Sequence, residues 1–454
     1  MAEPRVVVVG GGPGGMRACA ALVAGGVRPV LIDEGARPGG RIYQQPPVGA
    51  ARPARELYGF EAEKAARIHA LEAGLAGRIA YRPDTLVWNC FQGALDLLGP
   101  DGASRLPFDA LILATGATDL ALPFPGWTLP GVYALGGAQI ALKTQGCGIG
   151  RRVVFLGAGP LLPLVAWQYV QAGAEVAAVL DATPFGAKLR GLPAMLAAPA
   201  TLAKGVYYVA RLLAAGVPMF HDVRRPRAEG DGRVERVRFE AGGTEHEIAC
   251  DALGASFGLR SETQLADLAG CRFAFDARTR QYLPVRDGAG RSSVRFVHVA
   301  GDGAGIGGAD AAELAGERAA LALLEDLGLR FDVNRAAFLD GRLARLDRFR
   351  RGLETAYPFP AHMIADLDDA TMLCRCEGIS AGALRAAVRE KGAPEVNRAK
   401  AFTRVGMGRC QGRICGRAAA EILAHARGAA LEHSGRLRGQ PPVKPIPMIP
   451  ELLS

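Results

Sequence analysis

The amino-acid sequence predicts an α/β fold built from two dinucleotide-binding units and a small C-terminal domain with four cysteines. A strand, a glycine-rich turn, a helix and a second strand follow one another near the N-terminus, and the same order recurs at residues 153–181. Four cysteines then cluster between residues 374 and 415, whereas the other five are isolated. With 454 residues, the chain has room for about two to four domains.

The first unit carries an adenine-nucleotide motif. Gly10, Gly12 and Gly15 lie between a predicted strand at residues 5–9 and a predicted helix from residue 16. Glycines at this spacing permit a tight turn, close approach of the backbone to a pyrophosphate, and close helix–strand packing. The helix N-terminus then faces the phosphates. At the end of the next strand, Asp33, with Glu34 as the alternative, is expected to accept hydrogen bonds from the adenosine ribose.

The second unit departs from this pattern. Gly157 and Gly159 match the first two glycines, but Leu162 occupies the position of the third. We expect this leucine to hold the helix away from the strand and to crowd a pyrophosphate. Asp181 ends the following strand and can meet a ribose, but no arginine neighbours it to take the 2′-phosphate of NADP. The unit therefore predicts a degenerate fold, and the sequence argues against bound NAD.

Two further segments are expected to return to the first sheet. Residues 110–113 predict a strand that enters a turn at Thr115 and Gly116. Residues 294–300 predict another strand, which ends at Gly301 and Asp302. Five of the eight residues 301–308 are glycine, which allows the backbone to approach a cofactor closely.

The cysteine cluster predicts a metal-binding domain. One pair is separated by one residue and the other by four, with 33 residues between the pairs. Four thiolates bind either zinc or a [2Fe–2S] cluster, and the one-residue gap is unusual for zinc. We expect one helix between Ser380 and Gly392 and a second from near the last cysteine to about residue 426. The candidate ligands are Cys374, Cys376, Cys410 and Cys415.

The predicted domain order is discontinuous, because the first unit resumes after the second. We expect a helical connector before the cysteine domain and an extended, proline-rich tail after it, as an arm on a partner or a disordered end. The predicted boundaries are 1–120 and 251–330 for the first nucleotide-binding domain, 121–250 for the second, 331–370 for the connector, 371–430 for the cysteine domain and 431–454 for the tail.

The composition and the absence of certain motifs exclude several classes of function. The net charge is +9, but the arginines are scattered and aromatic residues make up only 6%, which argues against a nucleic-acid partner. Neither a signal peptide nor an apolar run of membrane-spanning length is found, so a cytoplasmic location is expected. Residues 1–330 contain no Cys-x-x-Cys pair, and the seven histidines are dispersed. We therefore assign no catalytic residue to this chain.

Several motifs resemble those of FAD-binding, disulfide-reductase-like flavoproteins. Gly40-Arg41, after the first unit, resembles their second glycine pair, and Thr115-Gly116 resembles their ATG turn. Gly301-Asp302 resembles the closing motif, in which an aspartate holds the flavin ribityl chain. The resemblance implies a two-dinucleotide-binding-domain fold with FAD, or another adenine nucleotide such as ATP, at the first site. The cysteine domain resembles the [2Fe–2S] domain of bacterioferritin-associated ferredoxin, although its four-residue gap is a variant.

The combination of these motifs resembles the larger, or A, subunits of opine oxidases and of hydroxyproline and proline dehydrogenases, and the B subunit of hydrogen cyanide synthase. The resemblance implies an electron-transfer subunit that works with a sarcosine-oxidase-like FAD subunit, which oxidises an amino or imino acid. It also implies FMN at a subunit interface and a small ferredoxin-like partner. Two alternatives stay open: a stand-alone NADH-dependent reductase of a small electron carrier, and a non-catalytic nucleotide-binding scaffold.

Overall fold

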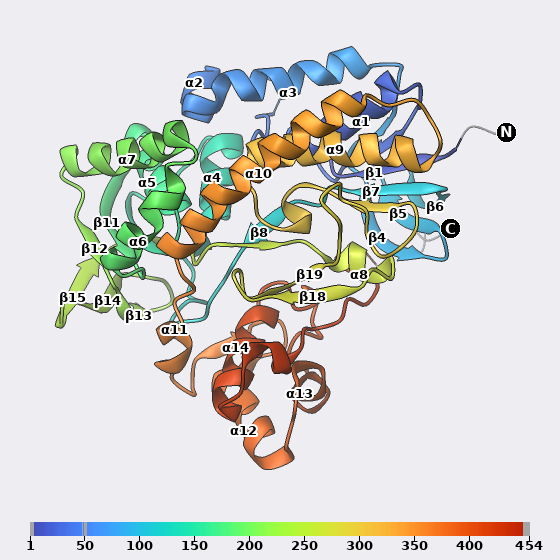
Figure 1. Cartoon of the computed structure of the whole chain (residues 1–454). Coiled ribbons are helices and arrows are strands. Elements are labelled where there is room, and N and C mark those ends of the chain that lie inside the picture. The colour runs from blue at the N-terminus through green and yellow to red at the C-terminus, as the bar shows by residue number, and fades with distance from the viewer. Residues whose placement is uncertain (1–3, 48, 50–51, 448–454) are drawn as a thin grey trace.

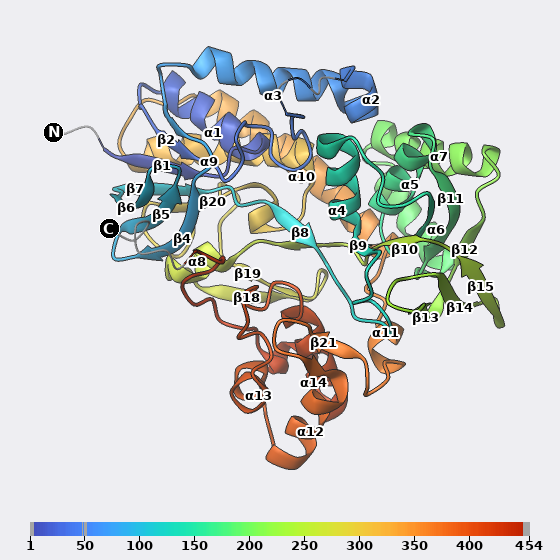
Figure 2. The ribbon, with the colours of Figure 1, turned by 180° about the vertical axis from the view of Figure 1, so that it is seen from behind.

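The computed structural model describes residues 4–47, 49 and 52–447 (Figures 1 and 2). All the strands of its first sheet are parallel. Valines of the central strand alternate between two apolar clusters, Val6 and Val8 on one side and Val7 and Val9 on the other. This alternation follows from the two-residue period of a strand. The strand order is β20 (Val297–Val299), β7 (Ala110–Leu113), β1 (Val6–Val9), β2 (Val30–Ile32) and β3 (Ala80–Arg82).

Helices cover one face of this sheet and a second, antiparallel sheet lies on the other. Helix α1 begins at Pro13 rather than at residue 16, because proline is well suited to the first helical turn. The helices are α1 (Pro13–Ala24), α2 (Ala54–Tyr58), η1 (Gly59–Glu61), α3 (Ala62–Leu75), η3 (Gly301–Ala304) and α9 (Ala309–Asp326). The antiparallel strands are β4 (Leu86–Phe91), β5 (Ala94–Gly99) and β6 (Gly102–Pro107).

The second unit repeats this plan. Its parallel sheet has the order β12 (Met219–His221), β11 (Glu175–Asp181), β10 (Arg152–Gly157), β16 (Ala252–Ser256) and β9 (Val132–Ala134). The helices are α4 (Leu135–Ile140), η2 (Ala141–Gln145), α5 (Leu161–Gln171), α6 (Phe185–Met195) and α7 (Pro199–Ala214). An antiparallel sheet is formed by β13 (Arg224–Glu229), β14 (Arg236–Ala241) and β15 (Thr244–Ala249).

The second sheet extends past residue 250, where we expected this domain to end. Strand β16 pairs in parallel with β10 and so belongs to the second sheet. The two nucleotide-fold domains are joined by the antiparallel pair of β8 (Ala117–Asp119) and β17 (Leu259–Ser261). Helix α8 (Gln264–Leu268) and the hairpin of β18 (Phe273–Asp276) and β19 (Gln281–Pro284) follow on the way back to the first sheet.

The connector between residues 331 and 370 is helical. Helix α10 (Val333–Ala356) runs from α9 across to α6 (Figure 1), and α11 (His362–Ala365) leads into the last domain. Gly191 of α6 and Gly352 of α10 allow the two helices to pack backbone against backbone, because a side chain at Gly352 would lie 2.7 Å from the amide nitrogen of Met195. The connector thus spans both nucleotide-fold domains.

The cysteine domain is a small helical body below both units (Figures 1 and 2). Ser380 caps its first helix by accepting a hydrogen bond from the amide of Ala383, and Gly392 ends that helix in the left-handed conformation. The elements are β21 (Met372–Cys374), β22 (Ile379–Ser380), α12 (Ala381–Lys391), α13 (Val396–Thr403), α14 (Gly416–Arg427) and η4 (Leu431–Ser434). Its apolar core is continuous with that of the second unit.

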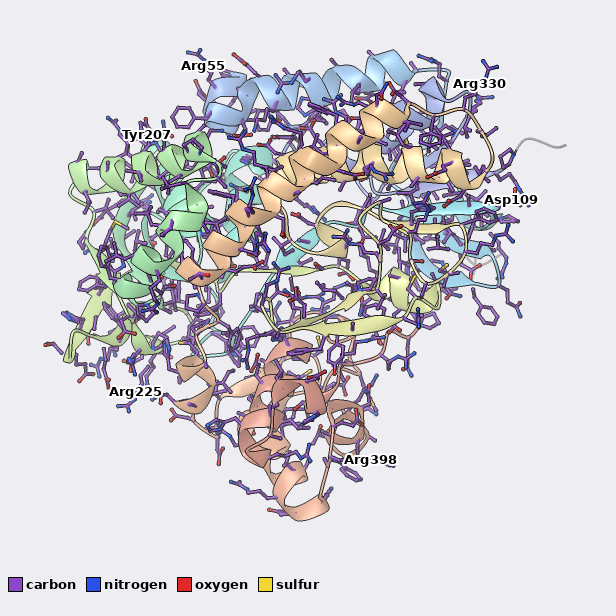
Figure 3. All side chains as sticks on the ribbon, in the orientation of Figure 1. Arg55, Asp109, Tyr207, Arg225, Arg330 and Arg398 are labelled. Carbon is purple, nitrogen blue, oxygen red and sulfur yellow. The ribbon has the colours of Figure 1, made fainter. Side chains whose placement is uncertain are left out.

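Arginine side chains are spread over the surface. Arg55, Arg225, Arg330 and Arg398 are exposed at separate edges of the molecule (Figure 3). In the parts of the chain that the structure describes, no helix is both long and apolar enough to span a membrane.

Close packing of α1 against α9 gives the first prediction. A Cβ atom at Gly316 would overlap the carbonyl oxygen of Gly14, whereas one at Gly341 on α10 would meet open space. Gly316→Ala is therefore expected to destabilise the protein by about 1–3 kcal/mol. Gly341→Ala, the matched control, is expected to stabilise it by about 0.5–1 kcal/mol. Urea unfolding midpoints measure both, and equal midpoints for the two variants would contradict the packing argument.

Candidate functional site

The glycine motif of the first unit forms a cradle at the end of β1. A Cβ atom at Gly10 would overlap the carbonyl of Ala114, and one at Gly15 would overlap the carbonyl of Gly10. At Gly12 the nearest atom to such a Cβ is 3.7 Å away, on Gly40. The packing of the chain itself thus requires glycine at positions 10 and 15. At position 12 the chain leaves room for a side chain, so only a bound ligand would require glycine there.

Three segments distant in sequence meet at this cradle. The amide of Gly39 donates to the carbonyl of Gly11 over 2.9 Å, and Gly40 has a left-handed φ of +62°. The Cα of Gly301 lies 4.0 Å from a Cβ built on Gly14, at the start of α1. The segments predicted to bind the cofactor, at residues 10–15, 40–41 and 301–302, are therefore neighbours.

The two acidic residues after β2 have different roles in the structure. Asp33 accepts hydrogen bonds from the amides of Gly11 and Gly35, the latter at 2.6 Å, and so fixes the loop backbone. Burial raises the pKa of Asp33, although both amides oppose that shift. Glu34 is exposed and forms ion pairs with Arg41, at 3.1 Å, and with Lys444.

Thr115, Gly116 and Asp302 lie at the same edge of the sheet. The Thr115 hydroxyl donates to the carbonyl of Glu262 over 2.5 Å, and Gly303 packs against Thr115, since a Cβ there would lie 2.6 Å from its hydroxyl. Asp302 accepts from the amides of Gly307 and Gly308 at 2.8 and 2.9 Å, just before α9. These bonds hold the closing loop in place.

In the second unit, the acidic residue at the end of β11 is held by neighbouring groups of the same chain. Asp181 is 5% exposed and binds Lys188 at 2.6 Å, the amide of Thr183 at 2.9 Å, and His221 at 3.8 Å. Burial alone would raise the pKa of Asp181, but His221 and Lys188 outweigh it and the pKa is lowered.

Leu162 does not project over the glycine turn of this unit. Its side chain is 1% exposed and lies in an apolar cluster with Phe155 of β10 and Val165 of α5. Gly157 has its backbone against the carbonyl of Ser256, whereas the space at Gly159 is open.

The four predicted ligands of the cysteine domain are neighbours. The thiol of Cys415 interacts with those of Cys374 and Cys410, and Cys410 also interacts with Cys376. The hydrogen bond from Cys415 is the main reason that the pKa of Cys374 falls to about 6 and that of Cys410 to about 4. The thiols form a chain of pairwise contacts, and no set of three or more metal-binding side chains surrounds one point in the described residues.

The loop around these thiols turns its backbone toward sulfur. Amides of Gly406, Glu377 and Cys376 donate to the Cys374 sulfur, and those of Ile414 and Gly412 donate to Cys410. Several residues that shape the loop have positive φ: Arg404, Gly406, Gln411 and Gly412. Backbone donors stabilise thiolates, so the loop suits thiolate ligands.

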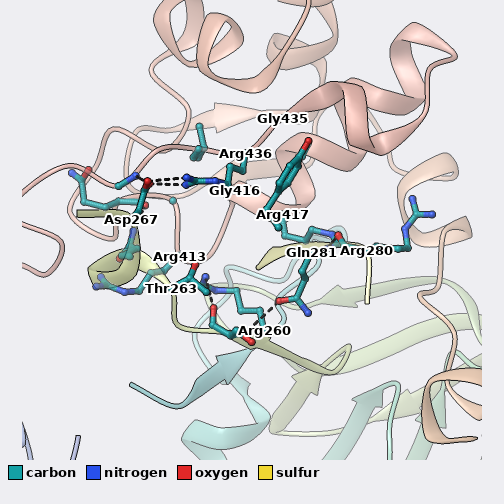
Figure 4. Close-up of a pocket in the computed structure, with 18 of the residues that line it drawn as sticks. Arg260, Thr263, Asp267, Arg280, Gln281, Arg413, Gly416, Arg417, Gly435 and Arg436 are labelled. Atoms are coloured by element: carbon teal, nitrogen blue, oxygen red, sulfur yellow. Dashed lines mark hydrogen bonds and ion pairs between the residues drawn. The ribbon is translucent and has the colours of Figure 1, made fainter. Parts of the chain in front are cut away.

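An arginine-lined cavity of about 120 Å³ lies between the cysteine loop and the segment that follows β17 (Figure 4). Three carboxylates beside it, each at most 9% exposed, are shared by two arginines apiece. These sets are Glu262 with Arg260 and Arg413, Glu421 with Arg280 and Arg417, and Asp267 with Arg436 and Arg438. Positive charge is therefore in excess around the cavity.

Glu262 joins the nucleotide domain to the cysteine loop. Its backbone amide donates to the carbonyl of Gly116 over 3.0 Å, and its carboxylate accepts from Arg413, between Cys410 and Cys415, also over 3.0 Å. Sequence reasoning did not find Glu262, Arg413 or Lys444. Their partners lie 151 and 410 residues away, and no local pattern marks such pairs.

Comparisons with known proteins agree with this architecture. Residues 4–319 match the model of the pyridine nucleotide-disulphide oxidoreductase family, and residues 372–425 match the BFD-like [2Fe-2S] binding domain. The chain is 36% identical to the A subunit of opine oxidase from Agrobacterium tumefaciens, over 97% of this chain and 90% of that protein. It is 34% identical to hydrogen cyanide synthase subunit HcnB of Pseudomonas aeruginosa, over 98% of this chain and 97% of that protein.

A solved structure has the same fold over nearly the whole chain. The L-proline dehydrogenase from P. horikoshii superposes with a TM-score of 0.74 at 20% identity, covering 99% of this chain and 79% of that chain. Together with the family matches, this confirms the predicted fold class and the predicted family resemblance.

The shared carboxylate of Glu262 gives the second prediction. Glu262→Gln leaves Arg260 and Arg413 without a buried counter-charge, and is expected to cost about 3–5 kcal/mol of unfolding free energy at pH 7. Burial alone would raise the pKa of Glu262, but the two arginines lower it overall. The difference from wild type is thus fully present above the ordinary glutamate pKa and shrinks as pH falls below it.

Urea unfolding at pH 7 and at pH 4 measures this difference. Glu247→Gln is the matched control, because Glu247 pairs with Arg238 at an exposed site and is expected to change stability by about 0.5 kcal/mol or less. Equal losses for the two variants would contradict the bridging role of Glu262.

Proposed function

Because the chain belongs to the pyridine nucleotide-disulphide oxidoreductase family and carries a BFD-like [2Fe-2S] binding domain, we propose that it is the electron-transfer subunit of a heteromeric amino- or imino-acid dehydrogenase. In this role it passes electrons from a partner's FAD to an external acceptor. The main observation in support is that one residue, Glu262, contacts both the Thr115–Gly116 turn and Arg413 of the cysteine loop.

The first unit is proposed to bind FAD, or another adenine nucleotide such as ATP. This proposal is supported by the glycine cradle. Backbone atoms pack tightly against Gly10 and Gly15, whereas the space beside Gly12 is open. Gly40 and Pro13, the first residue of α1, border the same space. A flavin, when bound, supplies the ability to take up two electrons and release them singly.

The cysteine domain is proposed to hold a [2Fe–2S] cluster through Cys374, Cys376, Cys410 and Cys415. Such a cluster supplies one-electron transfer. The fit rests on the donor set: four neighbouring thiols that receive hydrogen bonds from backbone amides. Lys400, 8% exposed, adds a buried positive charge close to Cys415.

The substrate chemistry is assigned to a partner. We assign no catalytic residue to the nucleotide units, and relatives are named as subunits of an opine oxidase and of hydrogen cyanide synthase. We propose that the catalytic partner is a sarcosine-oxidase-like FAD subunit, accompanied by a small ferredoxin-like subunit, and that the substrate class is opine, hydroxyproline, proline or glycine. FMN at the subunit interface belongs to the same proposal.

Direct oxidation of NADH is not favoured. Asp181, which would bind a ribose in the second unit, is already engaged by Lys188 and His221. A stand-alone NADH-dependent reductase therefore has less support than the subunit role. A scaffold without redox function does not account for the grouping of the four thiols.

The cysteine variant Cys410→Ser tests the function. The tagged chain is purified anaerobically from its own cells with the subunits that accompany it. We expect two irons and two sulfides per chain, and dye reduction with one of the proposed amino acids but not with NADH. Cys410→Ser is expected to lose most of the iron, because one of the four ligands is gone. Its reduction of acceptors that receive electrons after the partner's FAD is expected to fall at least tenfold.

Cys147→Ser is the matched control, because Cys147 is an exposed cysteine outside the cluster. Zinc or no metal in the wild-type protein would contradict the proposal. Reduction by NADH alone would favour the reductase, and unchanged acceptor reduction in Cys410→Ser would favour the scaffold.

Gly12→Ala tests the nucleotide site separately. A Cβ at this position meets no atom of the chain closer than 3.7 Å, so the folded state is expected to be as stable as wild type without nucleotide. The same Cβ enters the cradle, and at least a tenfold loss of bound nucleotide is expected. Quantifying the nucleotide released from each purified protein measures this, and unchanged content would place the nucleotide elsewhere.

A further inference from the structure

The C-terminal segment at residues 435–444 returns from the cysteine domain to the nucleotide domain, whereas residues 448–454 of the predicted tail lie outside the described residues. Leu437 packs on the cysteine loop, because a Cβ at Gly406 or at Gly412 would collide with its side chain. Arg436 and the amide of Gly439 both bind Asp267 of α8, each at 2.6 Å. The first half of the segment is thus fixed along the domain interface.

The second half is anchored in the core of the nucleotide domain. Val443 is 1% exposed and belongs to the same apolar cluster as Val87 and Leu95. Its amide donates to the carbonyl of Trp88 over 3.0 Å. The next residue, Lys444, is therefore held at a defined place beside β4.

Lys444 reaches the acidic end of the nucleotide cradle. Its ammonium pairs with Glu34, and Arg41 binds the same carboxylate at 3.1 Å. Glu34 is partly removed from water by the surrounding protein, which by itself would raise its pKa, but Lys444 and then Arg41 lower it overall, so this carboxylate stays ionised. Asp33 is partly buried and bound by two backbone amides, whereas the side chain of Glu34 is 41% exposed. Glu34 is therefore the acidic group that a ligand reaches more easily.

We propose that Lys444 is a positioning residue of the nucleotide site. It holds the Glu34 carboxylate in place to accept a hydrogen bond from a ribose hydroxyl of the adenine nucleotide. The C-terminal segment is then a part of that site, supplied from the opposite end of the chain. This inference rests on the adenine-nucleotide site proposed above.

The test compares ADP with 2′-deoxy-ADP, by titration calorimetry on the full chain after removal of bound nucleotide. Wild type is expected to bind ADP about fivefold more tightly than 2′-deoxy-ADP. Lys444→Ala is expected to reduce this preference to about twofold or less, through weaker ADP binding. Lys444→Arg retains the charge and is expected to keep the preference, as is the control Lys391→Ala on α12, far from the cradle.

A purely structural role of the segment would lower the thermal midpoint of Lys444→Ala and leave the preference unchanged, which would overturn the inference while the nucleotide site stands. No ADP binding to wild type would overturn both. As a second variant, a chain ending at Gly439 is expected to lose the preference, whereas one ending at Pro447 keeps it. An unchanged preference in the shorter chain also contradicts the inference.

Discussion

A carboxylate that leaves water must be matched by opposite charge and hydrogen bonds, and this requirement fixes how the cysteine domain sits on the nucleotide-binding domains. Glu262, Glu421 and Asp267 are buried, and each is shared by two arginines. Most of these contacts join segments far apart in sequence, so separating the domains would leave buried charges unpaired. The polar contacts thus define one orientation, and the apolar core shared with the second unit supports it.

This orientation places the cysteine loop next to the edge of the first sheet. Glu262 touches Thr115 and Gly116 through its backbone and Arg413 through its carboxylate. The turn at the nucleotide cradle and the loop between Cys410 and Cys415 are therefore separated by a single residue. A short path of this kind suits the electron transfer proposed above.

The two dinucleotide-fold units differ in the surroundings of their glycine turns and acidic residues. In the first, the backbone around Gly12 is open and the acidic residues lie at its border. In the second, Lys188 and His221 occupy Asp181, and Leu162 is buried in the core. The second unit packs against α10 through α6 and shares an apolar core with the cysteine domain.

The sequence alone determined the local features: the valine strands, the glycine turns, the capped helix after Ser380 and the family to which they belong. These signals are short-range, because strand alternation, helix caps and glycine turns depend on neighbouring residues. Only the tertiary structure decided that the second sheet continues to Ser256, that Glu262 bridges two domains, and that Lys444 meets Glu34. Such contacts carry no sequence signature, since any of 54 basic residues can pair with any of 45 acidic ones until the fold selects the partner.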